Sequence, residues 1–240
     1  MVGNMSVAFS IGDVEVMVRR SNKRRTVGLT IERDGQVVAA VPASMSLTEV
    51  TEIVRRRETW VHSALLRRSA IAPASVSKEY VSGEGFHYLG RSYRLRVLRG
   101  TTGASGLPEL RLFQGIFQLR ADCVPRGREC FVGWYTEQMG TWLSEKLPQL
   151  QRRVGAEVRR TSVMDLGFRW ASCSETGRVN FHWRAILLPP TLVSYLVLHE
   201  LCHLLEHNHT EKFWALVRRV DHDFERKEGW LRENGARFCL

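Results

Sequence analysis

The chain has 240 residues, of which 44% are hydrophobic and 25% are charged. These values are close to the averages of globular proteins and exclude a disordered or fibrous chain. The net charge of +10 is uneven: residues 1–120 hold 18 Lys or Arg against 10 Asp or Glu, whereas residues 121–240 hold 17 against 15. Such a basic region is usually a solvated face, although it could also meet nucleic acid or a phosphorylated substrate.

Targeting signals and cysteine spacing bear on the compartment. Residues 1–20 lack the apolar core of a signal peptide, and no segment approaches the roughly 18 apolar residues of a membrane span. The five cysteines are odd in number and contain no Cys-x-x-Cys pair, which fits neither a disulfide framework nor a cysteine zinc site. We therefore expect a cytoplasmic protein with reduced thiols and no membrane contact.

The chain opens with a pattern typical of β-strands. Residues 7–19 and 26–42 alternate apolar and polar side chains with a period of two. Asp34-Gly35 lies within the second stretch, between two apolar runs, and this dipeptide is the strongest short signal for a tight hairpin. The pattern predicts a sheet that contains a hairpin at this dipeptide.

One helix and two further hairpins are expected next. Ser46-Leu47-Thr48-Glu49 has the form of a capping box, and apolar residues recur at helical spacing from there to about Ala70. A connector of small residues at 73–77 follows. Turn signals then predict hairpins at Gly90 and around Gln114-Gly115.

The second half of the chain reads mainly as helix. The expected helices cover residues 128–154, residues 191–206, a stretch capped by Thr210 and a final stretch that includes Trp230 and Leu231, with short strands at 157–165 and 179–183. The sequence thus predicts an α+β fold. A β-rich region with one long helix would cover residues 1–125, and a helical region with a small sheet would cover residues 126–240, either as two domains or as one continuous domain.

The run His199-Glu200-Leu201-Cys202-His203 carries the chemistry. Because residues four apart lie on one face of a helix, His199 and His203 converge and can chelate one metal ion. Glu200, beside the first ligand, can accept a proton from a metal-activated water. The alternative is a pair of hydrogen-bonded core histidines, but such groups are costly to bury without partners in so apolar a helix.

A catalytic zinc site needs a third ligand and an open fourth position. His209 follows His199 by ten residues, which is the spacing of the third ligand in the motif His-Glu-x-x-His-x-x-Gly-x-x-His. His207 is the poorer candidate because, in a straight helix, it would lie roughly 12 Å along the axis from His199. We therefore expect His199, His203 and His209 to bind one Zn²⁺, or another divalent ion.

This chain departs from the longer motif at its glycine. Glu206 stands in that place, where a left-handed turn would be awkward for a glutamate. Asn208 could supply the turn instead, because Asn tolerates the left-handed conformation. Asp221 and Glu225 are more distant candidate ligands.

The sequence resembles the YgjP-like metal-dependent hydrolases, which are grouped with zincin-type metallopeptidases and are distantly similar to SprT-like and WLM proteins. The likeness is carried by residues 169–173, 179–190, 199–204, 208–209, 213–214 and 230–231, and more weakly by Lys23-Arg24-Arg25, Ala40-Val41-Pro42, Trp60 and Tyr88-Leu89-Gly90. The chain has Ala171 where the family usually has Gly, which leaves the backbone path near Cys173 open.

The resemblance implies a zincin-like second half with the three histidines as ligands and Glu200 as the catalytic carboxylate. It also suggests that Arg169 and Cys173 lie near the metal, although a purely structural strand and turn would explain both residues equally well.

The resemblance leaves the substrate open. The family is classed with peptidases, and a member is also reported as a pyrophosphatase acting on uridine triphosphate. An edge strand at Val179–Trp183 would suit an extended peptide, whereas Arg169 would suit a nucleoside triphosphate.

Several basic runs in the first half of the chain suit a function of another class. A nucleic-acid-binding module with a structural metal would use the basic runs Arg19-Arg20, Lys23-Arg24-Arg25, Arg55-Arg56-Arg57 and Arg67-Arg68. Aromatic residues are not interleaved with these runs, and successive residues of a helix cannot form one stripe. We therefore expect hydrolysis of a peptide ahead of hydrolysis of a nucleotide, and both ahead of nucleic-acid binding.

Overall fold

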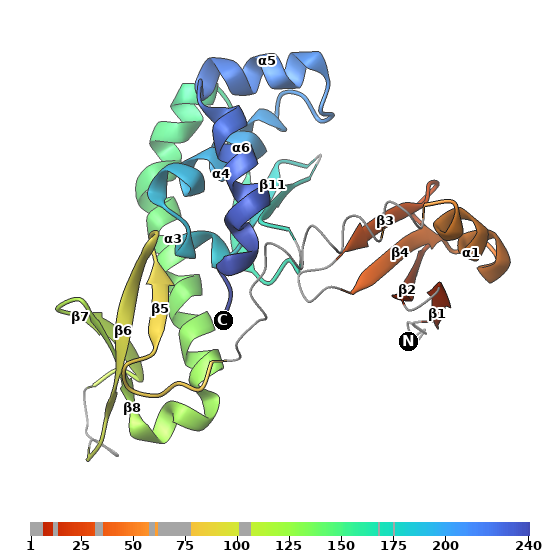
Figure 1. Cartoon of the computed structure of the whole chain (residues 1–240). Coiled ribbons are helices and arrows are strands. Elements are labelled where there is room, and N and C mark those ends of the chain that lie inside the picture. Colours follow the sequence, from red (N-terminus) through yellow and green to blue (C-terminus); the bar gives the residue numbers. More distant parts are fainter. Residues whose placement is uncertain are drawn as a thin grey trace. The chain divides into compact units, whose positions relative to one another are not determined.

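The structure is a computed structural model, which describes residues 7–11, 14–31, 36–57, 61, 78–100, 107–167, 169–174 and 176–240 (Figure 1). The chain divides into two compact units, residues 1–74 and residues 75–240. The expected boundary at residue 125 lies inside the second unit, in the short helix η1 (Ala121–Arg126). Within the described part of the chain, no helix is both long and apolar enough to cross a membrane.

The first unit is a four-stranded mixed sheet covered by one helix. Its strands are β1 (Val7–Ile11), β2 (Val14–Ser21), β3 (Gly28–Ile31) and β4 (Val37–Pro42), in the order β1-β2-β4-β3, and its helix is α1 (Leu47–Arg55). β2 and β4 run parallel, and the other pairs are antiparallel. Alternate residues of β2 and β4, such as Val16 and Val41, are buried with Val50 and Val54 of α1. The pairing of β3 with β4 confirms the expected hairpin, whose Asp34-Gly35 turn lies outside the described residues.

The expected capping box begins α1. The Glu49 amide donates to Ser46 Oγ at 3.3 Å, and the Ser46 amide donates to Glu49 Oε2 at 2.8 Å. Each side chain thus satisfies a backbone N–H that the first turn of a helix leaves unpaired. The helix ends at Arg55, and most of the stretch expected to extend it to Ala70 lies outside the described residues.

Removing the capping hydroxyl tests the contribution of this box. We expect Ser46→Ala to lower the free energy of unfolding of the first unit by about 1 kcal/mol, because an N–H of the first turn loses its acceptor. Urea unfolding followed by circular dichroism measures the change. Thr48→Ala, in the same exposed turn, is the control and should change stability by less than about 0.5 kcal/mol; equal losses in the two variants would contradict the assignment.

The second unit begins with another four-stranded mixed sheet. It contains β5 (Gly85–Tyr88), β6 (Arg91–Leu98), β7 (Leu110–Phe113) and β8 (Ile116–Arg120), in the order β5-β6-β8-β7. Both expected hairpins are present. Leu89-Gly90 and Gln114-Gly115 turn with positive φ at both residues, 48° and 78° in the first pair and 48° and 75° in the second. This backbone matches the twist of the flanking strands, and the glycine adopts it without steric conflict.

The third sheet has three strands, β9 (Arg160–Met164), β10 (Ala171–Cys173) and β11 (Arg178–His182). β11 lies in the middle, antiparallel to β10 and parallel to β9. The expectation that Val179–Trp183 forms an edge strand is therefore wrong, because both of its edges are already hydrogen-bonded. β10 and β9 are the two edge strands of this sheet.

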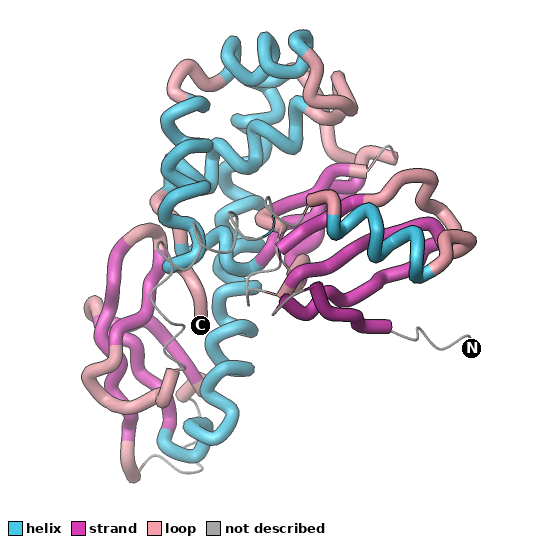
Figure 2. The backbone as a smooth tube through the Cα atoms, turned by 45° about the vertical axis from the view of Figure 1, so that its right-hand side comes forward, coloured by secondary structure: helices cyan, strands magenta, loops and turns pink. Residues whose placement is uncertain are grey.

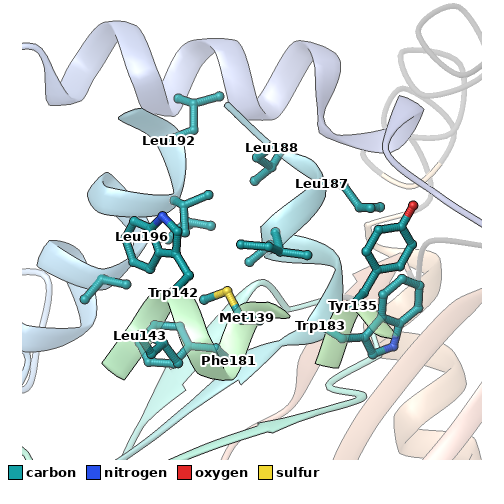
Figure 3. Close-up of a cluster of buried hydrophobic side chains, with 14 of the residues drawn as sticks. Tyr135, Met139, Trp142, Leu143, Phe181, Trp183, Leu187, Leu188, Leu192 and Leu196 are labelled. Carbon is teal, nitrogen blue, oxygen red and sulfur yellow. The ribbon is translucent and has the colours of Figure 1, made fainter. Parts of the chain in front are cut away.

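Helices complete the second unit and confirm the α+β class (Figure 2). They are α3 (Gly127–Val154), η2 (Trp183–Leu187), α4 (Pro190–Cys202), α5 (Glu211–Val220), α6 (Phe224–Asn234) and η3 (Gly235–Arg237). α4 was expected to reach Glu206 but ends four residues earlier. The core shown in Figure 3 joins Tyr135 and Met139 of α3 with Trp183 of η2 and with Leu192 and Leu196 of α4.

The turn between β5 and β6 is fixed against the start of α4. The amides of Leu89 and Gly90 donate to the carbonyls of Ile186 and Leu187, both at 2.9 Å. A Cβ atom at Gly90 would lie 2.8 Å from Pro189 Cγ and 2.9 Å from Pro189 Cα. Only glycine permits this approach, so the hairpin turn helps to set where α4 begins.

A pair of glycine variants isolates this contact. Gly115 has nearly the same φ, but nothing lies within 4 Å of its Cβ position, so Gly115→Ala should cost only about 1 kcal/mol for the left-handed backbone. We expect Gly90→Ala to cost at least about 1 kcal/mol more, since Pro189 must move. Thermal and urea unfolding of both variants measure the difference, and equal losses would show that the contact is unimportant.

Candidate metal centre

The last turn of α4 carries the His-Glu-x-x-His motif. His199 and Glu200 lie inside the helix, and His203 is its C-cap. The rings of His199 and His203 lie 5.0 Å apart between centroids, as the four-residue spacing predicts. The helix between them is buried on nearly every side, so the two imidazoles are held by the core.

The chain then turns back and brings His209 to the same place. His199 Nε2 and His209 Nε2 lie 3.1 Å apart. One nitrogen from each of His199, His203 and His209 lies within 4.8 Å of the other two. The three expected ligands therefore meet at one point, although no other residue in the described part of the chain joins this group.

The turn that returns His209 contains no left-handed residue. The non-glycine residues with positive φ, among those described, are Tyr80, Leu89 and Gln114, so the expectation of a left-handed turn at Asn208 is wrong. Instead, α4 ends in tightened hydrogen bonds. The amides of Leu204 and Leu205 donate to carbonyls three residues back, both at 3.1 Å. This tighter winding ends the helix without the motif's glycine.

Hydrogen bonding and burial leave the imidazoles ready to bind a cation. His203 Nδ1 lies 3.2 Å from the Glu206 carbonyl oxygen, which can only accept, so Nδ1 carries the proton and Nε2 keeps its lone pair. Burial, followed by the nearby His203 and His209, lowers the pKa of His199 to about 3. His199 is therefore neutral at physiological pH, as a metal ligand must be.

Phe213 forms an aromatic wall behind the three histidines. Its side chain is fully buried, and its ring centroid lies 4.3 Å from that of His203, 4.7 Å from that of His209 and 5.0 Å from that of His199. Thr210 caps α5 as expected, because its Oγ1 accepts from the Phe213 amide at 3.3 Å. From the sequence, Phe213 is identified only as part of a family likeness. Its position three residues after the cap is the signal that could have assigned it to the site.

Glu200 lies beside the histidines with 8% of its surface exposed. Burial raises the pKa of its carboxyl group to about 7, while the positive charge of Arg169 acts in the opposite direction. A carboxyl group in this range can both take up and release a proton near neutral pH, which suits a general base.

The group opens into a cavity of about 400 Å³. Apart from the three histidines and Glu200, its lining consists of Arg169, Ala171, Ser172, Cys173, His207 and Asn208. Arg169 and Cys173 thus line the same cavity as the three histidines. Burial and the neighbouring Glu200 raise the pKa of the Cys173 thiol to about 11, so it is protonated at neutral pH.

The other candidate ligands are engaged elsewhere. Asp221 is buried and accepts from Lys227 Nζ at 2.5 and 2.7 Å. Glu225 pairs with Arg218 at 2.9 Å. His207 lines the cavity without joining the three-nitrogen group.

A helix with His-Glu-x-x-His, a third imidazole and an adjoining cavity is the arrangement of metal-dependent hydrolases. Comparison with protein families gives the particular family: the model described as "YgjP-like, metallopeptidase domain" matches residues 25–234. The chain therefore belongs to the YgjP-like metallopeptidase family, which implies hydrolysis assisted by a divalent metal. No curated protein and no solved structure matched the chain.

The donors present fit such an ion. Three neutral imidazoles are a common ligand set for a divalent transition metal. With metal–nitrogen bonds of about 2.0 to 2.1 Å in tetrahedral geometry, two ligand nitrogens lie about 3.3 Å apart. The 3.1 Å between the Nε2 atoms of His199 and His209 is close to this value.

Metal content distinguishes His209 from its neighbour. We expect His209→Ala to lose most of its bound divalent metal, because two imidazoles alone hold an ion weakly, whereas His207→Ala should retain it. Elemental analysis of both purified variants beside the unaltered chain makes the comparison. Full metal content in His209→Ala would exclude it as the third ligand.

Proposed function

We propose that the protein is a zinc-dependent hydrolase, and specifically a zincin-like metallopeptidase in which His199, His203 and His209 bind the metal and Glu200 is the general base. The observation that supports this most directly is the meeting of three imidazole nitrogens beside a buried carboxyl group at the wall of one cavity. Imidazole ligands suit Zn²⁺ better than the oxygen-preferring ions Mg²⁺ and Ca²⁺.

The roles of the residues follow from their surroundings. A bound Zn²⁺ would supply Lewis acidity, which polarises an electrophilic substrate group and eases deprotonation of water. Glu200 takes the proton of the attacking water, because its pKa of about 7 allows it to be ionised near neutral pH. The same carboxyl group then delivers the proton to the leaving group. Burial in the wall keeps Glu200 beside the histidines throughout the cycle.

A peptide substrate is favoured by the strand next to the site. Ala171, Ser172 and Cys173 of β10 line the cavity, and β10 is one of the two edge strands of its sheet. An edge strand can take up an extended peptide through main-chain hydrogen bonds, which would carry a peptide bond past Glu200. Family membership supports the same choice.

A nucleoside triphosphate such as uridine triphosphate is the alternative substrate. The observation in its favour is Arg169, which lines the same cavity. Arginine binds phosphate oxygens through paired hydrogen bonds, and the same water activation would cleave a phosphoanhydride bond.

Replacing the carboxylate tests the proposed chemistry. Zinc-loaded protein is incubated with casein and, separately, with the common nucleoside triphosphates. We expect Glu200→Gln to lower the rate of peptide release by about 10²- to 10⁴-fold, the range for loss of a general base, while its zinc content is unchanged. Glu211→Gln, an exposed change outside the cavity lining, should keep full activity.

The two substrates give distinct outcomes. Pyrophosphate release that disappears in Glu200→Gln, without peptide release, would replace the peptidase proposal with the nucleotide alternative. Absence of both activities in zinc-loaded protein would contradict the proposed function.

A further inference from the structure

We propose that Glu109, Cys123 and Cys130 form a second metal site, which binds one thiophilic divalent cation of the zinc type. One carboxylate oxygen and the two Sγ atoms lie within 4.8 Å of one another. This group shares no residue with the histidine centre and is independent of the proposed hydrolase activity.

Three separate elements bring these side chains together, near the end of α3 that lies beside β7 and β8 (Figure 1). Glu109 immediately precedes β7, and its carbonyl accepts from the Arg120 amide at 3.0 Å, which extends the β7–β8 ladder by one pair. Cys123 lies in η1, and Cys130 lies in the first turn of α3. Cys123 and Cys130 are therefore held by helices, and Glu109 is held by its backbone hydrogen bond to Arg120 at the end of the β7–β8 ladder.

The side chains already contact one another through weak hydrogen bonds. Cys130 Sγ donates to Glu109 Oε2 at 3.6 Å, and Arg126 donates to Cys123 Sγ at 3.9 Å. Arg126 also forms an ion pair with the other oxygen of Glu109. The two cysteines are 1% and 9% exposed, so each presents its sulfur to this cluster rather than to solvent.

The bonds and charges that change when a metal binds at this cluster can be balanced. Two S–H bonds break, two metal–sulfur bonds and one metal–oxygen bond form, and two protons pass to solvent. Two thiolates and one carboxylate leave a net charge of −1 around a dication, and the guanidinium of Arg126 offsets it. The ion pair that Arg126 makes thus becomes part of the site.

A second cavity leads to the cluster. It has a volume of about 270 Å³, and its lining includes Glu109 and Cys130 together with Arg126, Glu129, Trp134 and Glu137. Three carboxylates give this cavity a negative potential that attracts a cation. The space also admits a water molecule, which would complete four-fold coordination around three protein ligands.

The donor atoms select the class of metal. Sulfur ligands favour Zn²⁺, Co²⁺ or Cd²⁺ over Mg²⁺ and Ca²⁺, which prefer oxygen. At metal–sulfur bonds of about 2.3 Å, tetrahedral coordination places two sulfur atoms about 3.8 Å apart. The three ligand atoms, already within 4.8 Å, therefore need only small side-chain rotations.

Cobalt provides a test that separates the two sites. The full chain, kept reduced and freed of metal, is titrated with Co²⁺. Thiolate ligation gives an intense sulfur-to-cobalt charge-transfer absorption, whereas a site of three histidines gives none. We expect this absorption in the unaltered chain and also in His203→Ala, because the second site does not use the histidines.

Cysteine variants identify the sulfur atoms responsible. We expect the absorption to be lost in Cys130→Ser and kept in Cys173→Ser and Cys239→Ser, whose thiols lie outside the cluster. Glu109→Gln keeps both sulfurs and the side-chain volume. Loss of an outer-shell partner already weakens metal binding about tenfold. We therefore expect Glu109→Gln, which loses a direct ligand, to weaken Co²⁺ binding at this site by at least that factor.

The proposal fails on either of two results. One is the absence of charge-transfer absorption in the folded, unaltered chain. The other is an absorption that survives in Cys130→Ser and in Glu109→Gln with unchanged affinity. Loss of hydrolysis in the histidine variants, with the absorption retained, would bear on the first site alone.

Discussion

The burial of α4 is the constraint on which the rest of the second unit depends. This helix is apolar on almost every side, yet its last turn carries two imidazoles and a carboxyl group. Polar groups placed in such surroundings are destabilising unless they find partners. Two of these groups have a partner: His203 Nδ1 has the Glu206 carbonyl, and His199 Nε2 faces His209. His199 Nδ1 is buried without a hydrogen-bond partner. The same burial lowers the pKa of His199 and raises that of Glu200, so the core that fixes the helix also prepares its chemistry.

Two contacts fix the two ends of α4: one sets where the helix begins, and the other positions the three histidines at its end. At its start, the glycine turn between β5 and β6 packs against Pro189 and hydrogen-bonds to the end of η2. At its end, the ring of Phe213 lies against all three histidines, and the cap at Thr210 sets the position of that ring. The sheet of β5–β8 and helix α5 therefore act on the metal centre through the backbone and the core, without supplying a ligand.

Local patterns in the sequence were sufficient for much of this fold. The capping box at Ser46, the turn at Gln114-Gly115 and the spacing of His199 and His203 each depend on neighbours a few residues away, and each is present. The expected edge strand at Val179–Trp183 failed for a different reason. Its buried, apolar pattern describes a strand covered on its faces, whereas its place in the sheet depends on β9 and β10, which lie elsewhere in the chain. Likewise, the turn after α4 is made by the tightened hydrogen bonds of Leu204 and Leu205 rather than by a left-handed Asn208.

The same distinction between local and long-range contacts explains why only one of the two candidate metal sites could be predicted from the sequence. Residues four apart on a helix must share a face, so the sequence alone brings His199 and His203 together. The spacing of Cys123 and Cys130 matches no metal motif, and by sequence they were assigned only as free thiols. They meet Glu109 because the β7–β8 ladder returns the chain to the first turn of α3. A ligand set drawn from a strand end, a short helix and a long helix exists only after the fold has formed, and so its affinity for metal would add directly to the stability of that corner of the second unit.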